Sequence, residues 1–340
     1  MKAALLYGVG DLRVVDLPKP EPQPDEVLMK VTVCGVCPTD IRKFRVGNGG
    51  VLKFPFNMGH EWVGEVVEVG SAVSDVKVGE KLIGGGYAGY AEYAPLGGMA
   101  LRPVGGSTLK VPEGVTDEEA TFVEPLADAI HSTVNQGKVT LGSTVLIVGG
   151  GQLALQHLMV AKALGATVIV SEQIAERREL AKQFGADHVL DGTSTEDVVA
   201  AVKDLTDGKG ADAAIVSIGQ PEASVVGVES VRERARVVLF GGYDRGVKTT
   251  LDLNIIHYKE IELVGSYWVG VPPYQNTELY KLALRLIQEK KVRVADLITH
   301  RATLDDIHDV FDAIRTRAGL KAMIYVGASP DQQAEPAADD

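Results

Sequence analysis

Two short segments near the amino terminus carry residue types that bind metals. They read CGVCPTD and GHEWVGEVVEVGS, and a further acid, Glu124, lies in FVEPLADAIHS. Zinc is bound by thiolate, imidazole and carboxylate ligands, and a catalytic zinc site keeps one coordination position open. Cys37, His60 and Glu61 supply these three ligand types. The pattern favours a catalytic metal site formed by these residues, with Glu124 as an additional candidate.

A glycine-rich turn in TVLIVGGGQLALQH is the second chemical signature. Gly149, Gly151 and Ala154 fill the pattern G-x-G-x-x-G/A between an apolar strand and a helix. The first glycine permits a tight turn, the second lets the backbone approach a pyrophosphate, and the small third residue lets helix and strand pack closely. Glu172 ends the next strand, about 20 residues later, where a carboxylate accepts hydrogen bonds from ribose hydroxyls. The simpler alternative is a glycine turn followed by a solvated glutamate.

The acid at this strand end also bears on which dinucleotide binds. Two unit charges ~4 Å apart repel by ~4 kcal/mol at an effective dielectric of ~20, so Glu172 disfavours a 2′-phosphate and the sequence predicts NAD over NADP. Arg177, five residues further on, is placed to reach the same ribose or the adenine. An ordinary solvated base on a helix explains Arg177 equally well.

The two cysteines allow chemistry other than zinc binding. Cys34 and Cys37 form a C-x-x-C, which can be a redox pair, but no thioredoxin-like βαβ pattern starts there. Two cysteines cannot build a structural zinc site of four. A buried cysteine and a surface histidine would account for either residue alone. That simpler interpretation leaves unexplained why both motifs precede a nucleotide-binding pattern.

Composition limits the kind of protein that presents these motifs. At roughly 100–200 residues per domain, 340 residues suggest two domains. A net charge of -12 argues against a nucleic-acid binder, and no apolar run approaches the ~18 residues of a membrane span. The first residues do not resemble a secretory signal. With two cysteines there is no disulfide framework, so a reducing cytoplasm is the expected compartment.

Two different patterns of elements divide the chain. Up to about residue 125, β-rich runs such as KAALLYG, LRVVDLP, EVLMKVTV, VGEVVEV and TLKVP are separated by glycine, proline and acidic turns. From about Thr144, the apolar runs TVLIVG, TVIVSE, HVL, AAIVSIG, RVVLFGG and IELVGSYW alternate with helical patterns. Those helices are LALQHLMVAKALG, IAERRELAKQFG, STEDVVAAVKDLTDG and PEASVVGVESVRER. The alternation predicts a parallel sheet covered on both faces, hence an α/β fold.

Further helices and a strand are expected around this sheet. A capping box at Thr116 and Glu119 predicts a helix through about Val134 that joins the two halves. Helices are also predicted from about Thr277 to Glu289 and after Thr303. KAMIYV then reads as a final strand, which we assign to the first domain.

Together, these motifs resemble the zinc-containing medium-chain alcohol dehydrogenases, especially their polyol (sorbitol) and threonine dehydrogenase branch. The resemblance runs from Met1 to about Gly327, and GHEWVGEVVEVGS is its most specific part. It implies that Cys37 and His60 are zinc ligands and that Glu61 ligates directly or alternately with water. It also matches Glu124 to the glutamate that this branch carries where other alcohol dehydrogenases have a second cysteine.

The resemblance assigns further roles near the two sites. It matches Thr39 to the hydroxyl residue that takes the proton of the substrate alcohol, and Asp40 to the acid behind the histidine ligand. It places Leu153 behind the nicotinamide ring. Many relatives carry a histidine two residues after that acid to relay the proton, but here Arg42 stands in its place. Because a guanidinium does not release its proton in proteins, the usual relay is interrupted.

The resemblance also implies an architecture and an assembly. A mostly β, GroES-like catalytic domain would span 1–128 and take back residues 269–327, and a Rossmann NAD-binding domain would span 129–268. Residues 328–340, with four acids and no base, are expected to be a disordered tail. A homotetramer or a dimer is implied. KLIGGGYAGYAEYAPLG lacks the four-cysteine lobe that many relatives carry, so we expect one catalytic zinc per subunit and no structural zinc.

The expected activity is hydride transfer between a small secondary alcohol and NAD, the alcohol being a polyol, a sugar or a hydroxy amino acid. Tyr87, Tyr267 and Trp268 either line a substrate pocket or pack in the core or between subunits. His157, in the first helix after the glycine turn, is expected to be a packing residue. Two alternatives stay open: a zinc-free enone or quinone reductase of the same fold, and a non-catalytic, crystallin-like nucleotide-binding protein.

Overall fold

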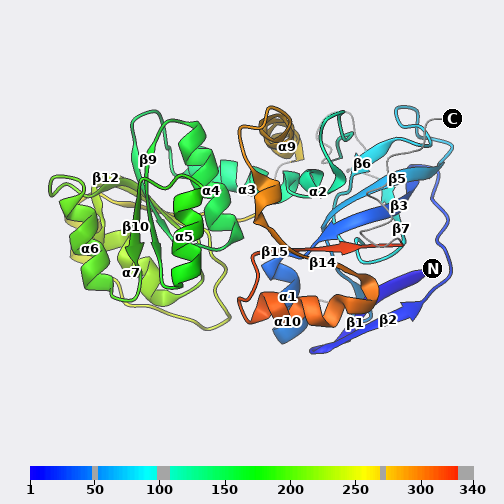
Figure 1. Cartoon of the computed structure of the whole chain (residues 1–340), viewed down its shortest axis with the longest axis horizontal. Coiled ribbons are helices and arrows are strands. Elements are labelled where there is room, and N and C mark those ends of the chain that lie inside the picture. Colours follow the sequence, from blue (N-terminus) through cyan, green and yellow to red (C-terminus); the bar gives the residue numbers. More distant parts are fainter. Residues whose placement is uncertain (48–52, 98–107, 269–272, 328–340) are drawn as a thin grey trace. The chain divides into compact units, whose positions relative to one another are not determined.

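The computed structural model describes residues 1–47, 53–97, 108–268 and 273–327. The chain forms two compact units, Met1–Glu124 with Gly270–Asp340, and Pro125–Val269 (Figure 1). The division falls inside helix α3 (Val123–Ile130), four residues before the boundary predicted at 128. The predicted tail lies outside the described residues.

Antiparallel strands dominate the first unit. Its larger sheet has the order β14-β15-β3-β5-β6, with β7 also paired to β3, and its smaller sheet has the order β2-β1-β4. The strands are β1 (Lys2–Gly8), β2 (Asp11–Asp16), β3 (Glu26–Gly35), β4 (Phe56–Asn57), β5 (Glu61–Val69), β6 (Lys81–Ile83), β7 (Tyr93–Gly97), β14 (Ile298–Thr303) and β15 (Lys321–Tyr325). TLKVP, predicted as a strand, contributes only an isolated bridge between Lys110 and Leu82.

The carboxyl-terminal segment completes the larger sheet. β15 pairs antiparallel with β3, where Ile324 lies opposite Cys34, and parallel with β14. Before and between these strands come α9 (Pro273–Gln288), two 3-10 turns, η3 (Val294–Leu297) and η4 (Leu304–Asp306), and then α10 (Ile307–Arg315). Apolar side chains from both ends of the chain therefore share one core.

Helix α1 (Pro38–Val46) was not predicted, because this region was interpreted as β-structure throughout. The thiol of Cys37 caps the helix by accepting a hydrogen bond from the Thr39 amide at 3.5 Å, and Asp40 closes a capping box. Pro38 at the first helical position is preset for helical geometry, and bases in the last turn suit the helix dipole. The helix thus begins at the candidate metal ligand.

The predicted helix from residue 116 to 134 is broken into three parts. The capping box of Thr116 and Glu119 opens α2 (Asp117–Ala120), as predicted, but α3 follows as a separate helix and continues into a π-helical turn, η2 (His131–Gln136). Pro125 explains the break, because it has no amide hydrogen to donate to the preceding turn.

The second unit contains a six-stranded, fully parallel sheet of order β10-β9-β8-β11-β12-β13. Its strands are β8 (Thr144–Val148), β9 (Thr167–Glu172), β10 (His188–Asp191), β11 (Ala211–Val216), β12 (Val231–Leu239) and β13 (Glu262–Gly265). Its helices are α4 (Gln152–Ala163), α5 (Ala175–Gln183), α6 (Thr195–Asp204), α7 (Pro221–Glu229) and α8 (Leu253–Tyr258). The strand order is that of a Rossmann fold, which confirms the predicted α/β architecture (Figure 1).

Two details of this unit differ from the sequence prediction. The helix predicted over PEASVVGVESVRER ends at Glu229, and Val231 already begins β12. Burial of Val231 against the sheet outweighs the helical pattern of the charged residues that follow it. Helix α8 was not predicted. Within the described ranges, no helix is long and apolar enough to cross a bilayer.

Candidate metal and nucleotide sites

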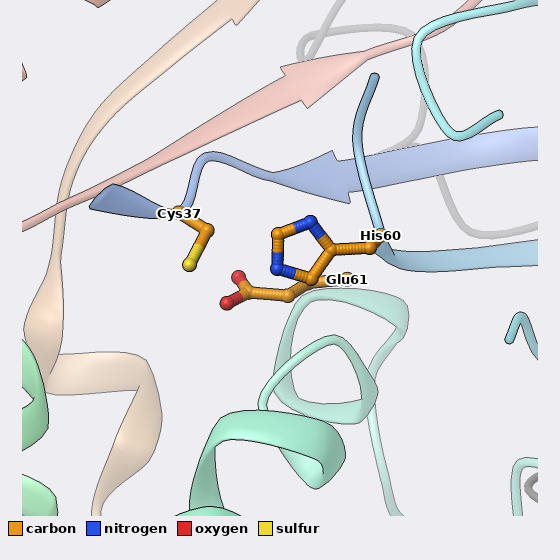
Figure 2. Close-up of side chains that lie close together, drawn as sticks. All are labelled: Cys37, His60 and Glu61. Carbon is orange, nitrogen blue, oxygen red and sulfur yellow. The ribbon is translucent and has the colours of Figure 1, made fainter. Parts of the chain in front are cut away.

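Three potential metal ligands come together in the first unit. Sγ of Cys37, a ring nitrogen of His60 and a carboxylate oxygen of Glu61 all lie within 4.8 Å of one another, and Figure 2 shows the three side chains facing one space. Cys37 follows β3, while His60 and Glu61 enter β5. Because Gly35 at the end of β3 lies opposite Glu61, the pairing of these two strands brings the thiol to the acid.

Glu61 forms a fully buried ion pair that sequence reasoning missed. Its Oε2 accepts a hydrogen bond from Nζ of Lys321, the first residue of β15. A Cβ atom at Gly35 would lie 2.8 Å from both Glu61 Oε2 and Lys321 Cε, so only glycine leaves room for the pair. Burial lowers the pKa of Lys321 to about 8. The one signal in the sequence is a lone lysine at the start of an apolar strand.

Asp40 lies beside the imidazole of His60, whose buried Nδ1 makes no hydrogen bond among the described residues. Oδ1 of Asp40 lies 3.5 Å from His60 Nδ1, and the two oxygens of Asp40 accept from the Tyr90 hydroxyl at 3.0 Å and the amides of Gly59 and Cys37. Burial alone would lower the pKa of His60, but Asp40 and Cys37 raise it well above its usual value. For Asp40, burial favours a higher pKa, yet His60 and the hydrogen bonds lower it. The surroundings therefore favour positive charge at the imidazole.

This cluster fits a zinc ion. Oε1 of Glu61, the oxygen not used by Lys321, is buried and has no hydrogen-bond partner among the described residues. A buried oxygen without a partner is costly, and a metal ion would satisfy it. Thiolate, imidazole and carboxylate are the ligand types that zinc prefers, and the negative surroundings suit a divalent cation.

The other predicted residues of this region have distinct positions. Glu124 lies partly buried in the first turn of α3 and is not one of the three clustered residues. Thr39 is exposed in the first turn of α1, and Arg42 follows it in the same helix. Cys34 is a free thiol in the core, where burial raises its pKa. A high pKa makes Cys34 a poor thiolate and separates its role from that of Cys37.

The glycine-rich turn of the second unit has the geometry that the motif predicts. Gly149 has a φ of +113°, which favours glycine, and Gly151 caps the amino terminus of α4. Glu172 at the end of β9 accepts hydrogen bonds from the amides of Gly150 at 2.5 Å and Ile174 at 2.8 Å. A Cβ at Gly150 would lie 2.8 Å from Cγ of Glu172. Position 150 is therefore also restricted to glycine, although the G-x-G-x-x-G/A motif allows any residue there.

Three further residues surround this turn. Ala154 is buried in α4, and Leu153 beside it is partly exposed. Arg177 lies in α5, and its Nη1 is 3.9 Å from the position that a Cβ of Gly151 would take. A guanidinium therefore lies beside the amino terminus of α4, where a phosphate would bind.

The structure also shows where the three aromatic residues singled out in the sequence, and His157, lie. Tyr87 lies in the first unit, with its ring centroid 5.3 Å from that of His60. Tyr267 and Trp268 follow β13 in the second unit and are exposed rather than packed in its core. His157 is fully buried, as predicted, and packs edge-on against Phe240 with centroids 4.6 Å apart.

Comparison with known proteins matches two family models to consecutive parts of the chain. Residues 23–122 match the alcohol dehydrogenase GroES-like domain, and residues 151–289 match the zinc-binding dehydrogenase domain. Sorbitol dehydrogenase of Bombyx mori is 31% identical, covering 95% of this chain and 98% of that protein. L-threonine 3-dehydrogenase of Pyrococcus horikoshii is 35% identical, covering 93% and 94%.

Solved structures of dehydrogenases have the same fold as this chain. 2R,3R-butanediol dehydrogenase of Bacillus subtilis has a TM-score of 0.84 at 26% identity, covering 95% of this chain and 99% of that one. A dehydrogenase from Sinorhizobium meliloti with NADP bound has the same TM-score and identity, covering 95% and 98%. These matches confirm the GroES-like and Rossmann domains. The chain therefore belongs to the zinc-dependent alcohol and polyol dehydrogenase family and is an alcohol oxidoreductase that uses a nicotinamide cofactor.

Proposed function

We propose that the protein oxidises a secondary alcohol, carried by a polyol, a sugar or a hydroxy amino acid, with NAD as the hydride acceptor. The relatives named as sorbitol, threonine and butanediol dehydrogenases support this substrate range. The observation that carries the proposal is the cluster of Cys37, His60 and Glu61, with its one unpartnered carboxylate oxygen within the described part of the chain. Glu124 is proposed as an additional or alternate ligand.

Cys37, His60 and Glu61 would hold the zinc ion, and the glycine turn at Gly149 and Gly151 would hold the dinucleotide. When bound, the zinc would supply Lewis-acid chemistry toward the alcohol oxygen and the nicotinamide would supply the hydride acceptor, while the chain supplies the positions of both. Asp40 lies beside the ring of His60, and Lys321 holds one oxygen of Glu61 while leaving the other available.

Thr39 is proposed to take the proton from the alcohol. It is exposed, next but one to Cys37, and a hydroxyl can accept and donate a proton at once. Arg42 cannot continue the relay, because its guanidinium stays protonated. We therefore propose that the proton leaves through a ribose hydroxyl and water, or through a water held by Glu61 or Glu124.

NAD is the proposed cofactor on account of Glu172. Two backbone amides, those of Gly150 and Ile174, hold its carboxylate at the end of β9. A fixed negative charge there repels a 2′-phosphate. We expect NAD to be preferred to NADP by roughly 100-fold or more in kcat/KM, after allowance for screening. Gly149, Gly151, Leu153, Ala154 and Arg177 complete the proposed binding turn.

Stoichiometry, assembly and location are parts of the same proposal. One catalytic zinc per subunit is expected, since the cysteine lobe is missing from the sequence. A homotetramer or dimer is supported by β13, which lies at the edge of its sheet and is followed by the exposed side chains of Tyr267 and Trp268. The two free cysteines favour a cytoplasmic location.

The deciding experiment is a screen of NAD reduction over polyols, sugars, amino alcohols and simple secondary alcohols, combined with metal analysis. Turnover that is lost on zinc removal and restored by zinc supports the proposal. Activity toward enones or quinones that survives removal of zinc would instead identify a zinc-free reductase. Bound zinc and NAD without turnover of any alcohol would point to a non-catalytic protein.

A further inference from the structure

A buried lysine lies beside the candidate metal site without an acidic partner. Lys43, on α1, is only 8% exposed. Its ammonium donates a hydrogen bond to the Tyr87 hydroxyl at 2.5 Å and lies over the Tyr87 ring, 4.7 Å from its centroid, and no carboxylate of the described residues pairs with it. An ammonium has three donors, so two remain without an acceptor in the described part of the chain. Burying a charge without a counter-charge is unfavourable, which indicates that an anion completes this position.

Tyr87 connects the lysine to the metal ligands. Its ring packs edge-on against His60, with centroids 5.3 Å apart, and against Phe56 at 5.0 Å. The hydroxyl and the face of the same ring contact the ammonium of Lys43. The side chain is 41% exposed, so it borders both the metal cluster and solvent.

The loop that carries Tyr87 is held in an unusual conformation. Ala88 has a φ of +134°, which is rare for a residue with a side chain, and such strain persists only where the surroundings enforce it. The amides of Ala88 and Gly89 both donate to the carbonyl of Gly59, directly before His60, at 3.1 and 2.9 Å. The loop is therefore fixed to the metal-binding strand, and Tyr87 with it.

The geometry of helix α1 places Thr39, the proposed proton acceptor, on the same side of the helix as Lys43. Thr39 and Lys43 are four residues apart on α1, so they lie on one face of the helix. A molecule that places its hydroxyl at Thr39 and the metal ligands also meets the ammonium one turn further along.

We infer that the substrate of this enzyme is a secondary alcohol that carries an anionic group, a carboxylate or a phosphate, and that Lys43 binds this group with Tyr87 as its positioning residue. This inference rests on the proposed alcohol dehydrogenase function and names the substrate class more narrowly. Neutral polyols would then be poorer substrates than their acidic or phosphorylated counterparts.

Matched pairs of alcohols test it. The zinc-loaded enzyme is assayed with 1,3-butanediol against 3-hydroxybutanoate, and with ribitol against ribitol 5-phosphate, using saturating NAD. We expect kcat/KM to be about 10- to 100-fold higher for the anionic member of at least one pair, the range of a charge-assisted hydrogen bond. A preference in the first pair would identify a carboxylate as the group that is bound, and a preference in the second pair would identify a phosphate.

Variants assign the preference to Lys43. Lys43→Met should remove it, mainly by raising KM for the anionic member, and Lys43→Arg should restore most of it. Lys30→Met is the control, because Lys30 is an exposed lysine on β3. Tyr87→Phe should reduce the preference partially, since it removes the acceptor that positions the ammonium. Zinc content and NAD affinity, measured in parallel, verify that each variant retains its sites.

The outcomes separate this inference from the proposed function. Equal kcat/KM for both members of every pair in the wild type, or a preference that survives Lys43→Met, would overturn the inference while leaving the dehydrogenase proposal intact. If a protein that binds zinc and NAD oxidises none of the alcohols, neutral or anionic, the proposed function itself is refuted.

Discussion

His157 makes the stability of the second unit depend on pH. The ring is completely buried in α4, and neither nitrogen has a hydrogen-bond partner among the described residues. Burial in these surroundings lowers the pKa of His157 to about 3. In the unfolded chain the imidazole titrates near its ordinary value of ~6.5. The unfolded state therefore binds a proton more readily than the folded state between these two values.

The sign and size of the effect follow from linkage. Above pH ~6.5 the ring is neutral in both states and contributes no pH dependence, whereas below it protonation stabilises only the unfolded chain. The free energy of unfolding therefore decreases as pH falls from ~6.5 toward the folded pKa of about 3. At about pH 5 the loss through this one group is about 2 kcal/mol. His157→Leu should abolish this contribution.

The assay compares urea unfolding of wild type and His157→Leu at about pH 7.5 and about pH 5. Groups that titrate in both proteins cancel, so the variant should gain about 2 kcal/mol relative to wild type between the two pH values. Gln156→Leu is the control, because Gln156 is an equally buried neighbour that does not titrate. An identical change with pH in wild type and His157→Leu would show that the buried ring is protonated or hydrated in the folded state, which would refute the reasoning.

Other substitutions test the two sites. Cys37→Ser should lose zinc and activity, since a hydroxyl is a far poorer ligand than a thiolate, whereas Cys34→Ser should lose much less; elemental analysis and turnover decide, and a zinc-replete Cys37→Ser protein would contradict the assignment. Glu172→Ala should narrow the preference for NAD over NADP in steady-state kinetics, and an unchanged ratio would place the acid away from the ribose. Thr39→Val should slow hydride transfer by at least ~100-fold in pre-steady-state measurements, whereas Arg42→His should leave it largely intact; the reverse pattern would mean that the proton takes another route.

The nucleotide-binding turn was predictable because its parts are adjacent in sequence. Gly149, Gly151 and Ala154 belong to one strand–turn–helix, and Glu172 ends the very next strand. The alternation of apolar strands and helices likewise predicted the parallel sheet, since each crossover is local. The need for Gly150 was not predictable, because it arises from contact with Glu172 rather than from the turn itself.

The surroundings of the candidate metal ligands depend on contacts that sequence spacing does not reveal. Helix α1 begins at Cys37, an uncommon capping residue, so the usual helix-start signals were weak. The ion pair between Glu61 and Lys321 joins residues 260 positions apart. The sequence does not distinguish Lys43 from other lysines, and its role depends on the fold bringing Tyr87 to it. Each of these depends on tertiary pairing of strands or loops rather than on local pattern.

The pairing of β3 with β15 sets an order for synthesis. Residues 1–124 leave the ribosome long before β15. Until β15 follows, Val33–Gly35 have β5 on one side but no strand on the other, and Glu61 lacks Lys321. The nucleotide-binding unit is one continuous stretch, so every strand of its sheet is present earlier. We therefore expect the nascent chain to complete its cofactor-binding sheet before its candidate metal site, and a chain that stops before Ile298 to bind a nicotinamide cofactor but to retain no zinc.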